Sequence, residues 1–210
     1  HDLDFTTSAR PEVIQEILGE WGEKVWDTGI EFGTVSAIRH GETVEITTFR
    51  SDLYDGVTRN PEVTFGDTLE GDLIRRDFAC NAMAIELSLD DELRLSPTFH
   101  DPVDGLGDLV EQVLDTPQEP EVSFRDDPLR MLRAARFVSQ LGFTVADRVF
   151  DAMCDMAAEI ERITAERVQA ELDKLMLGAR PWEGIDLLVS TGLASYILPE
   201  IPALQLETDE

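Results

Sequence analysis

Residues 2–6, Asp-Leu-Asp-Phe-Thr, are predicted to form a short strand that carries two carboxylates two positions apart. Alternate side chains of a strand project from the same face, so Asp2 and Asp4 point the same way, roughly 6–7 Å apart along the chain. Glu45 lies in a second predicted strand, on the face opposite its two apolar neighbours. If the two strands are neighbours in one sheet, three carboxylates converge.

Carboxylates in this arrangement suit Mg²⁺, which takes a few carboxylate oxygens and leaves positions for phosphate oxygens. In an acidic chain, a pair of aspartates alone more often belongs to a strand that is simply exposed to solvent. The interpretation as a metal site therefore depends on the third carboxylate, Glu45. Three converging carboxylates would hold two metal ions and stabilise both an attacking hydroxyl and a leaving pyrophosphate. We therefore predict Asp2, Asp4 and Glu45 as catalytic residues, with Asp2 and Asp4 as Mg²⁺ ligands.

The chain around these strands changes character near residues 115–122. Before that point, a strand over 2–6 is followed by a helix that starts at Pro11. A hairpin is predicted over 32–49, and 51–68 reads as a long exposed loop because it is rich in Asp, Gly, Asn and Thr. Beyond that point the apolar spacing is helical throughout. The predicted helices are 126–141, 147–161, 165–178 and 182–192. The fold class is therefore α+β, a mixed sheet region followed by an all-helical region.

The composition is strongly acidic. The 210 residues include 44 acidic and 17 basic side chains, for a net charge of −27. Such a chain repels nucleic acid at long range, and only local basic clusters could reverse this. Two explanations stay open: a salt-adapted or highly solvated surface, or a basic RNA-gripping part outside this sequence.

The composition also indicates a cytoplasmic protein. No apolar run approaches the ~20 residues of a membrane span, and the opening residues have no signal-peptide character. Cys80 and Cys154 have no metal-type spacing, so we expect a reducing compartment and two thiols in the core.

Five stretches resemble, in order, the motifs of the class II tRNA nucleotidyltransferase and bacterial poly(A) polymerase family. They are 1–7 (HDLDFTT), 75–82 (RRDFACNA), 101–109 (DPVDGLGDL), 124–130 (FRDDPLR) and 166–175 (ERVQAELDKL). Five motifs in the family's order span nearly the whole chain, which chance agreement would not produce.

The resemblance implies a polymerase β-like nucleotidyltransferase head with a mixed sheet, followed by an all-helical neck and body. On that basis we divide the chain into a head over 1–118, a neck over 119–180 that carries a nucleotide-selecting helix, and the start of a body over 181–210. The family's first motif begins with a Gly-Gly-x-x-Arg-Asp element upstream of the aspartate pair, and this sequence lacks it. We therefore expect the head to be incomplete at its N-terminus, without the residues that hold the triphosphate.

Asp127 and Arg130 stand three positions apart, so on a helix they share one surface. On an arbitrary helix this would be an ion pair of little consequence. Cytosine and adenine, however, both present an amino donor beside a ring-nitrogen acceptor, which a carboxylate and a guanidinium can bind together. Uracil and guanine reverse these groups, and the unpaired groups that result cause strong rejection. The resemblance assigns base selection to this pair.

The resemblance also implies nucleotide contacts for Arg76, Arg133 and Arg136, while Asp77 and Asn81 would fix Arg76 and the local helix turn. The third motif would be structural and would join the head to the neck. The fifth motif would form a helix that supports the selecting helix, although its charged residues could equally be ordinary exposed charges.

The implied activity is template-independent addition of CCA to the 3′ end of tRNA from CTP and ATP, with Mg²⁺ and release of pyrophosphate. The loop over 50–61 resembles the flexible loop of enzymes that complete all three additions, which favours CCA addition over CC addition. Poly(A) polymerases share the motifs and stay open as an alternative. An alternative of another class is a non-catalytic RNA-binding fragment. The expected partners are the tRNA 3′ end, CTP and ATP, with no membrane and no evident protein partner.

Overall fold

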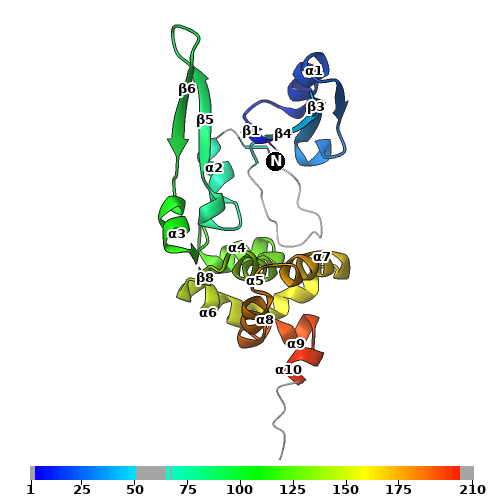
Figure 1. Ribbon diagram of the computed structural model, residues 1–210, viewed down its shortest axis with the longest axis vertical. Coiled ribbons are helices and arrows are strands. Elements are labelled where there is room, and N and C mark those ends of the chain that lie inside the picture. The colour runs from blue at the N-terminus through cyan, green and yellow to red at the C-terminus, as the bar shows by residue number, and fades with distance from the viewer. Residues whose placement is uncertain (1–2, 51–64, 67, 204–210) are drawn as a thin grey trace, which may run out of the picture. The chain divides into compact units, whose positions relative to one another are not determined.

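A computed structural model describes residues 3–50, 65–66 and 68–203 (Figure 1). The chain separates into two compact units, His1–Arg75 and Arg76–Glu210, and each is described by itself. The predicted division into 1–118, 119–180 and 181–210 stays a prediction. The predicted loop over 51–68 falls almost entirely outside the described residues.

The first unit is built on a four-stranded mixed sheet, which confirms the predicted fold class. Its strands are β1 (Leu3–Thr7), β2 (Lys24–Trp26), β3 (Thr34–Arg39) and β4 (Glu42–Thr48), in the order β1-β4-β3-β2. Strand β1 runs parallel to β4, whereas β3 is antiparallel to both of its neighbours. A short 3₁₀ turn, η1 (Ile30–Phe32), precedes β3, and helix α2 (Leu69–Ile74) closes the unit.

The turn between β3 and β4 confirms the predicted hairpin. His40 and Gly41 both have positive φ angles, 53° and 81°. Two consecutive residues with positive φ give a turn whose twist matches that of the flanking strands. The register that follows pairs Arg39 with Glu42 and continues to Thr34 opposite Thr47.

One face of this sheet is apolar and is covered by helix α1 (Pro11–Trp21). Ile14 and Leu18 of α1 form a small buried cluster with Val35 and Ala37 of β3. The helix begins where predicted, with Pro11 in its first turn, and the fixed φ of proline suits that position. Because α1 covers the apolar face, Ser36 and Glu45, which alternate with these apolar residues and their register partners, are left on the other face.

The second unit combines a hairpin with a group of helices, and α5 lies at its centre. Three of the helices carry most of the argument below: α4 (Pro120–Asp126), α5 (Leu129–Leu141) and α7 (Ala165–Met176). Helix α5 packs against α7 and α8, and its Met131, Leu132, Ala134 and Ala135 are fully buried. The remaining elements are η2 (Ala79–Asn81), β5 (Ala84–Leu89), β6 (Leu95–His100), α3 (Gly105–Glu111), β7 (Val113–Leu114), β8 (Thr144–Val145), α6 (Asp147–Met156), η3 (Ala157–Arg162), α8 (Pro181–Ser190), α9 (Ala194–Ile197) and α10 (Glu200–Ala203).

The predicted helix over 126–141 is wrong at its start. The chain leaves the helical conformation at Asp127, which has φ −144° and ψ 99°, and α5 begins only at Leu129. Pro128 explains the break, because its ring disfavours helical geometry in the preceding residue and it has no N–H to donate. Asp127 and Arg130 therefore flank a turn between two helices and do not share the surface of one helix.

The two thiols differ in exposure. Cys80 is half-buried, and burial, together with the nearby Asp77 and Asp108, raises its pKa to about 11. Cys154 is exposed, so the expectation of a core position is wrong for this residue. Among the residues that the structure describes, no helix is long and apolar enough to cross a membrane.

The net charge of −27 predicts stabilisation by salt. Like charges repel each other in the compact state, and the Debye length falls from about 10 Å at 0.1 M to about 3 Å at 1 M salt. We expect the Tm, followed by circular dichroism, to rise by about 5 °C or more from 0.1 to 2 M KCl. Replacing the exposed Glu12, Glu16 and Glu20 of α1 by Gln should reduce the slope. A Tm that does not rise with the KCl concentration would contradict the explanation that the acidic surface is adapted to salt.

Candidate active site

The strand register brings two of the three predicted carboxylates together. Asp4 of β1 lies directly opposite Glu45 of β4, so the predicted neighbourhood of these strands is confirmed. Register partners in adjacent strands project from the same face of a sheet. Both residues are exposed, and Ser36 of β3 donates a hydrogen bond of 3.4 Å from Oγ to Glu45 Oε1. Asp2 lies outside the described residues.

The orientation of Glu45 follows from the side chains next to it in β4. Val44 is buried and Ile46 packs against the cluster under α1. Since strand side chains alternate, Glu45 is directed to the opposite, polar face. The predicted face of Glu45 is therefore confirmed.

Asp4 and Glu45 offer hard oxygen donors of the kind that Mg²⁺ prefers. Two exposed carboxylates on adjacent strands leave room for further oxygen ligands from phosphate or water, so the donor set fits this ion. No group of three metal-binding side chains occurs within 3–50, 65–66 and 68–203. The participation of Asp2 stays a prediction.

Sequence reasoning missed Asp72, a carboxylate at the other end of this polar face. Asp72 is only 2 % exposed and lies in α2. Its Oδ1 accepts hydrogen bonds from the backbone N–H of Arg50 at 3.1 Å and from the Arg75 guanidinium, and its Oδ2 accepts one from Thr6 Oγ1 at 3.4 Å. Asp72 thus ties the ends of β1 and β4 to α2. Its spacing of three from Arg75 was the available sequence signal.

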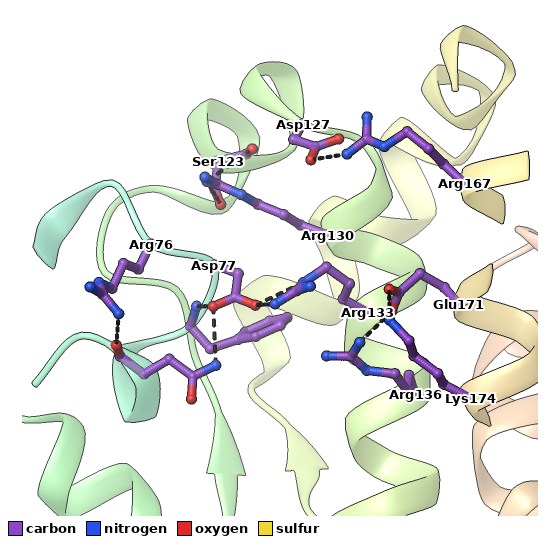
Figure 2. A network of polar contacts seen from close by, with 12 residues as sticks. Arg76, Asp77, Ser123, Asp127, Arg130, Arg133, Arg136, Arg167, Glu171 and Lys174 are labelled. Carbon is purple, nitrogen blue, oxygen red and sulfur yellow. Dashed lines mark hydrogen bonds and ion pairs between the residues drawn. The ribbon is translucent and has the colours of Figure 1, made fainter. Parts of the chain in front are cut away.

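In the second unit, Asp77 binds Arg133, as Figure 2 shows. Arg133 Nε donates to Asp77 Oδ2 at 2.9 Å and Nη2 contacts the same oxygen, while the Asn81 side chain donates to Oδ1 at 3.1 Å. Burial opposes ionisation of Asp77, but Arg133, Asn81 and the Phe78 N–H outweigh it and lower the pKa of the carboxyl. This contribution to stability is present above the pKa of the unfolded state, about 4, and is lost as the pH falls below it.

Asp77 and Asn81 are predicted to fix Arg76 and the local helix turn. Asn81 does contact Arg76, whose Nη1 donates to the Asn81 backbone oxygen at 3.5 Å. Asp77 accepts the Asn81 side chain and the Phe78 N–H within the turn. The ion pair of Asp77, however, is with Arg133. The Arg133 side chain lies 56 positions along the chain from Asp77, so the ion pair joins the second motif directly to helix α5.

Asp127 and Arg130, the predicted selecting pair, are each held by a different partner (Figure 2). Asp127 Oδ1 accepts the backbone N–H of Leu129 at 3.2 Å, and its Oδ2 accepts Nη2 of Arg167 from α7 at 2.8 Å. Arg130 Nη1 donates to Ser123 Oγ at 2.8 Å and weakly to the Ser123 backbone oxygen at 3.4 Å. Both side chains are thus fixed beside the α4–α5 turn. Their role in base selection stays a prediction.

Arg136, also predicted to bind nucleotide, lies buried between α5 and α7. Its Nη1 is 2.8 Å from Glu171 Oε2, and the two residues are 7 % and 4 % exposed. Lys174 also donates to Glu171, at 3.3 Å. Burial above all, and then the neighbouring Arg133, lower the pKa of Arg136, whose guanidinium lies over the Phe137 ring at 4.4 Å.

The fifth motif has two interpretations: a helix that supports the selecting helix, or a helix that carries ordinary exposed charges. These contacts favour the first. Arg167 and Glu171 of α7 bind Asp127 and Arg136, and α7 packs along α5. The helix supports α5 and does not merely carry exposed charges. A nucleotide contact for Arg136 itself stays a prediction.

Replacing Glu171 by Gln should destabilise the second unit by about 2 to 3 kcal/mol. The change keeps the side-chain volume but leaves Arg136 buried without its counter-charge. The measurement is the denaturant midpoint by far-UV circular dichroism. Glu159→Gln is the matched control, since Glu159 pairs with Arg162 at a site where both side chains are more than 40 % exposed, and we expect less than about 1 kcal/mol there. Equal effects for the two variants would contradict the conclusion that the buried pair of Arg136 and Glu171 stabilises the second unit.

The third motif makes structural contacts within the second unit, and its predicted role of joining the head to the neck stays a prediction. Asp101 Oδ1 accepts the backbone N–H of Gly105 at 2.7 Å and Oδ2 accepts that of Leu106 at 2.9 Å, so Asp101 caps the start of α3. Gly105 lies against the backbone of Ala79 in η2, where a Cβ would meet the carbonyl group well inside contact distance. The third motif therefore packs α3 against η2, which belongs to the second motif.

Two family models match the chain. The model described as the poly(A) polymerase head domain matches residues 1–115, and the model described as the probable RNA- and SrmB-binding site of polymerase A matches residues 142–204. The first match covers more than half of the chain and includes Asp4, Glu45 and Arg76.

Individual relatives agree with the family models. The CCA-adding enzymes of Levilactobacillus brevis and Pediococcus pentosaceus are 41% and 39% identical over 197 residues, which is 93% of this chain and 47% of each relative. The Bacillus stearothermophilus CCA-adding enzyme in complex with CTP superposes with a TM-score of 0.79 at 35% identity, over 98% of this chain and 48% of that one. A tRNA nucleotidyltransferase with a primer tRNA and an ATP analogue superposes with a TM-score of 0.74 at 28% identity, over 94% of this chain and 54% of that one. This chain spans about half the length of these relatives.

Proposed function

Because this chain belongs to the family of poly(A) polymerases and CCA-adding enzymes, we propose that it provides the catalytic and base-selecting parts of an enzyme that adds CCA to the 3′ end of tRNA. The observation that carries the proposal is the pairing of Asp4 with Glu45 on the polar face of the mixed sheet. The relatives named above as CCA-adding enzymes support this reaction over polyadenylation.

Asp4 and Glu45, together with Asp2, would hold Mg²⁺ at the exposed edge of the sheet. A divalent cation bound there supplies charge neutralisation to the attacking 3′ oxygen and to the pyrophosphate that leaves. The residues of the chain fix the carboxylates: Ser36 donates to Glu45, and the β1–β4 pairing sets the spacing to Asp4. The 3′-hydroxyl gives up its proton to water and its oxygen forms a bond to the α-phosphorus of CTP or ATP, while the bond from that phosphorus to the bridging oxygen breaks and pyrophosphate leaves.

Asp127 and Arg130 select the base in this proposal. The carboxylate accepts the amino N–H of cytosine or adenine and the guanidinium donates to the neighbouring ring nitrogen. Uracil and guanine present the reversed groups to the same two residues, so donor faces donor and acceptor faces acceptor. No template is needed, because the protein itself reads the base edge.

The test uses the complete protein encoded by the gene, a tRNA that ends at the discriminator base, Mg²⁺ and each nucleotide singly. We expect incorporation from CTP, then from ATP after two cytidines, and none from UTP or GTP. Equal use of UTP and CTP, or long adenosine tails without cytidine, would overturn the CCA assignment. Absence of Mg²⁺-dependent pyrophosphate release would favour the non-catalytic RNA-binding alternative.

Asp127→Ala should relax base choice more than it weakens metal binding. We expect the ratio of CTP to UTP incorporation to fall about 30-fold, because the acceptor that discriminates amino from carbonyl groups is lost. Single-turnover incorporation measures the ratio, and a Mg²⁺ titration of the rate provides the second readout. Glu121→Ala, at an exposed position of α4, is the control. Unchanged selectivity in the Asp127 variant would count against this role.

A further inference from the structure

Ser123 contacts both members of the proposed selecting pair, although it lies outside every motif. Its Oγ accepts Nη1 of Arg130 at 2.8 Å, and its backbone oxygen accepts the N–H of Asp127 at 3.2 Å. The side chain lies in α4 and is fully buried, with 0 % exposure. The backbone contact is the last hydrogen bond of α4, whereas the contact with the Arg130 guanidinium depends on the serine hydroxyl.

A base edge is read correctly only if the guanidinium is held in one orientation. A free arginine side chain loses rotamer entropy when it becomes ordered. A hydrogen bond between its charged donor and a fixed oxygen removes part of that loss before the nucleotide binds. Ser123 is placed to do this because both its backbone and its side chain are fixed by the buried end of α4.

We propose that Ser123 is a positioning residue for base selection, which orients Arg130 through its hydroxyl. The proposal rests on the proposed function of Asp127 and Arg130. The alternative is a buried serine that merely satisfies a hydrogen bond. A merely structural serine would change stability and lower the rates with all nucleotides alike, whereas a positioning serine changes the discrimination between them.

The experiment uses Ser123→Ala, which deletes only the hydroxyl that binds Arg130 and keeps the backbone oxygen, and Ser123→Thr, which keeps a hydroxyl there. Ser139→Ala is the matched control, since Ser139 is another fully buried serine of the same unit and its Oγ donates to the backbone oxygen of Leu175 at 2.6 Å. The complete protein of each variant is assayed with a tRNA lacking CCA, by single-turnover incorporation of CTP and of UTP. The Tm of each variant is recorded by circular dichroism.

For Ser123→Ala we expect KM for CTP to rise and the ratio of kcat/KM for CTP over UTP to fall by about 5- to 10-fold. Ser139→Ala should lower the Tm by a similar amount while its ratio stays within about twofold of wild type. Ser123→Thr should restore the ratio if it folds. If it does not fold, the comparison of Ser123→Ala with Ser139→Ala decides.

Three results would overturn the proposal: an unchanged ratio in Ser123→Ala, an equal loss in Ser139→Ala, or a folded Ser123→Thr with the defect of Ser123→Ala. Failure of the proposed function looks different, because then the wild-type protein itself would not prefer CTP to UTP. A wild type that discriminates together with an unaffected Ser123→Ala would leave the function standing and remove only Ser123 from it.

Discussion

Glu45→Gln in the complete protein should lower kcat for nucleotide addition by at least about 1,000-fold. The amide keeps the volume and the hydrogen bond from Ser36 but removes the charge that would bind Mg²⁺ beside Asp4. Asp4→Asn should have a loss of the same order. Because the two carboxylates act on the same bound cation, the double variant should be little worse than either single one. The measurement is Mg²⁺-dependent pyrophosphate release with a tRNA lacking CCA.

The matched control for this prediction is Glu42→Gln. Glu42 is an exposed carboxylate of the same strand, three positions away and therefore on the other face, where its register partner is Arg39. Its replacement removes the same charge from the same element, so any general effect of charge or strand stability appears in it as well. If Glu45→Gln keeps more than about a tenth of wild-type activity, or if Glu42→Gln loses as much, the catalytic assignment fails.

The sheet and its carboxylates were predictable because their signals are local. Alternation in β4 predicted the face of Glu45, and the D-x-D spacing predicted that Asp2 and Asp4 share a face. The pairing of β1 with β4 needed the structure, and so did strand β2, which was not predicted from the sequence. Strand alternation has a period of two, so an assignment of faces survives errors of a few residues at the strand ends.

The error at the start of α5 was avoidable from the sequence. Pro128 follows Asp127 directly, and a residue before proline is displaced from helical geometry. The apolar periodicity of 129–141 is strong, and on that basis the predicted helix was extended to residue 126. The proline at 128 was the better indicator of where the helix begins. The break gives Asp127 the extended conformation in which it reaches Arg167.

The ion pairs that organise the second unit could not be predicted from spacing. Asp77 and Arg133 are 56 positions apart, and Asp127 and Arg167 are 40 apart. Such pairs form only after α5 has packed on α7 and on the segment before β5. Ser123 illustrates the same limit at short range: it lies seven positions from Arg130, but the turn between the two helices determines their contact.

Gly105→Ala should destabilise the second unit by about 4 kcal/mol, well beyond the usual range for a surface substitution. A Cβ at this position would overlap the Ala79 carbonyl oxygen and lie 2.7 Å from its carbon. Both are backbone atoms of η2, so no side chain can rotate away and α3 must shift as a whole. Since η2 also carries Asn81, which holds Asp77, the shift should reduce nucleotide addition in parallel. The denaturant midpoint by circular dichroism measures the first effect.

Gly107→Ala, two residues further along α3, separates this contact from the general effect of adding a methyl group. The Cβ at Gly107 would lie 2.9 Å from Asp104 Oδ2, the end of an exposed side chain that can move aside. Alanine also has the higher helix propensity, so we expect a change between no loss and a gain of about 0.5 kcal/mol. A Gly105 variant as stable as the Gly107 variant would mean that α3 can move away from η2 without loss of stability. The third motif would then not hold the second motif in place.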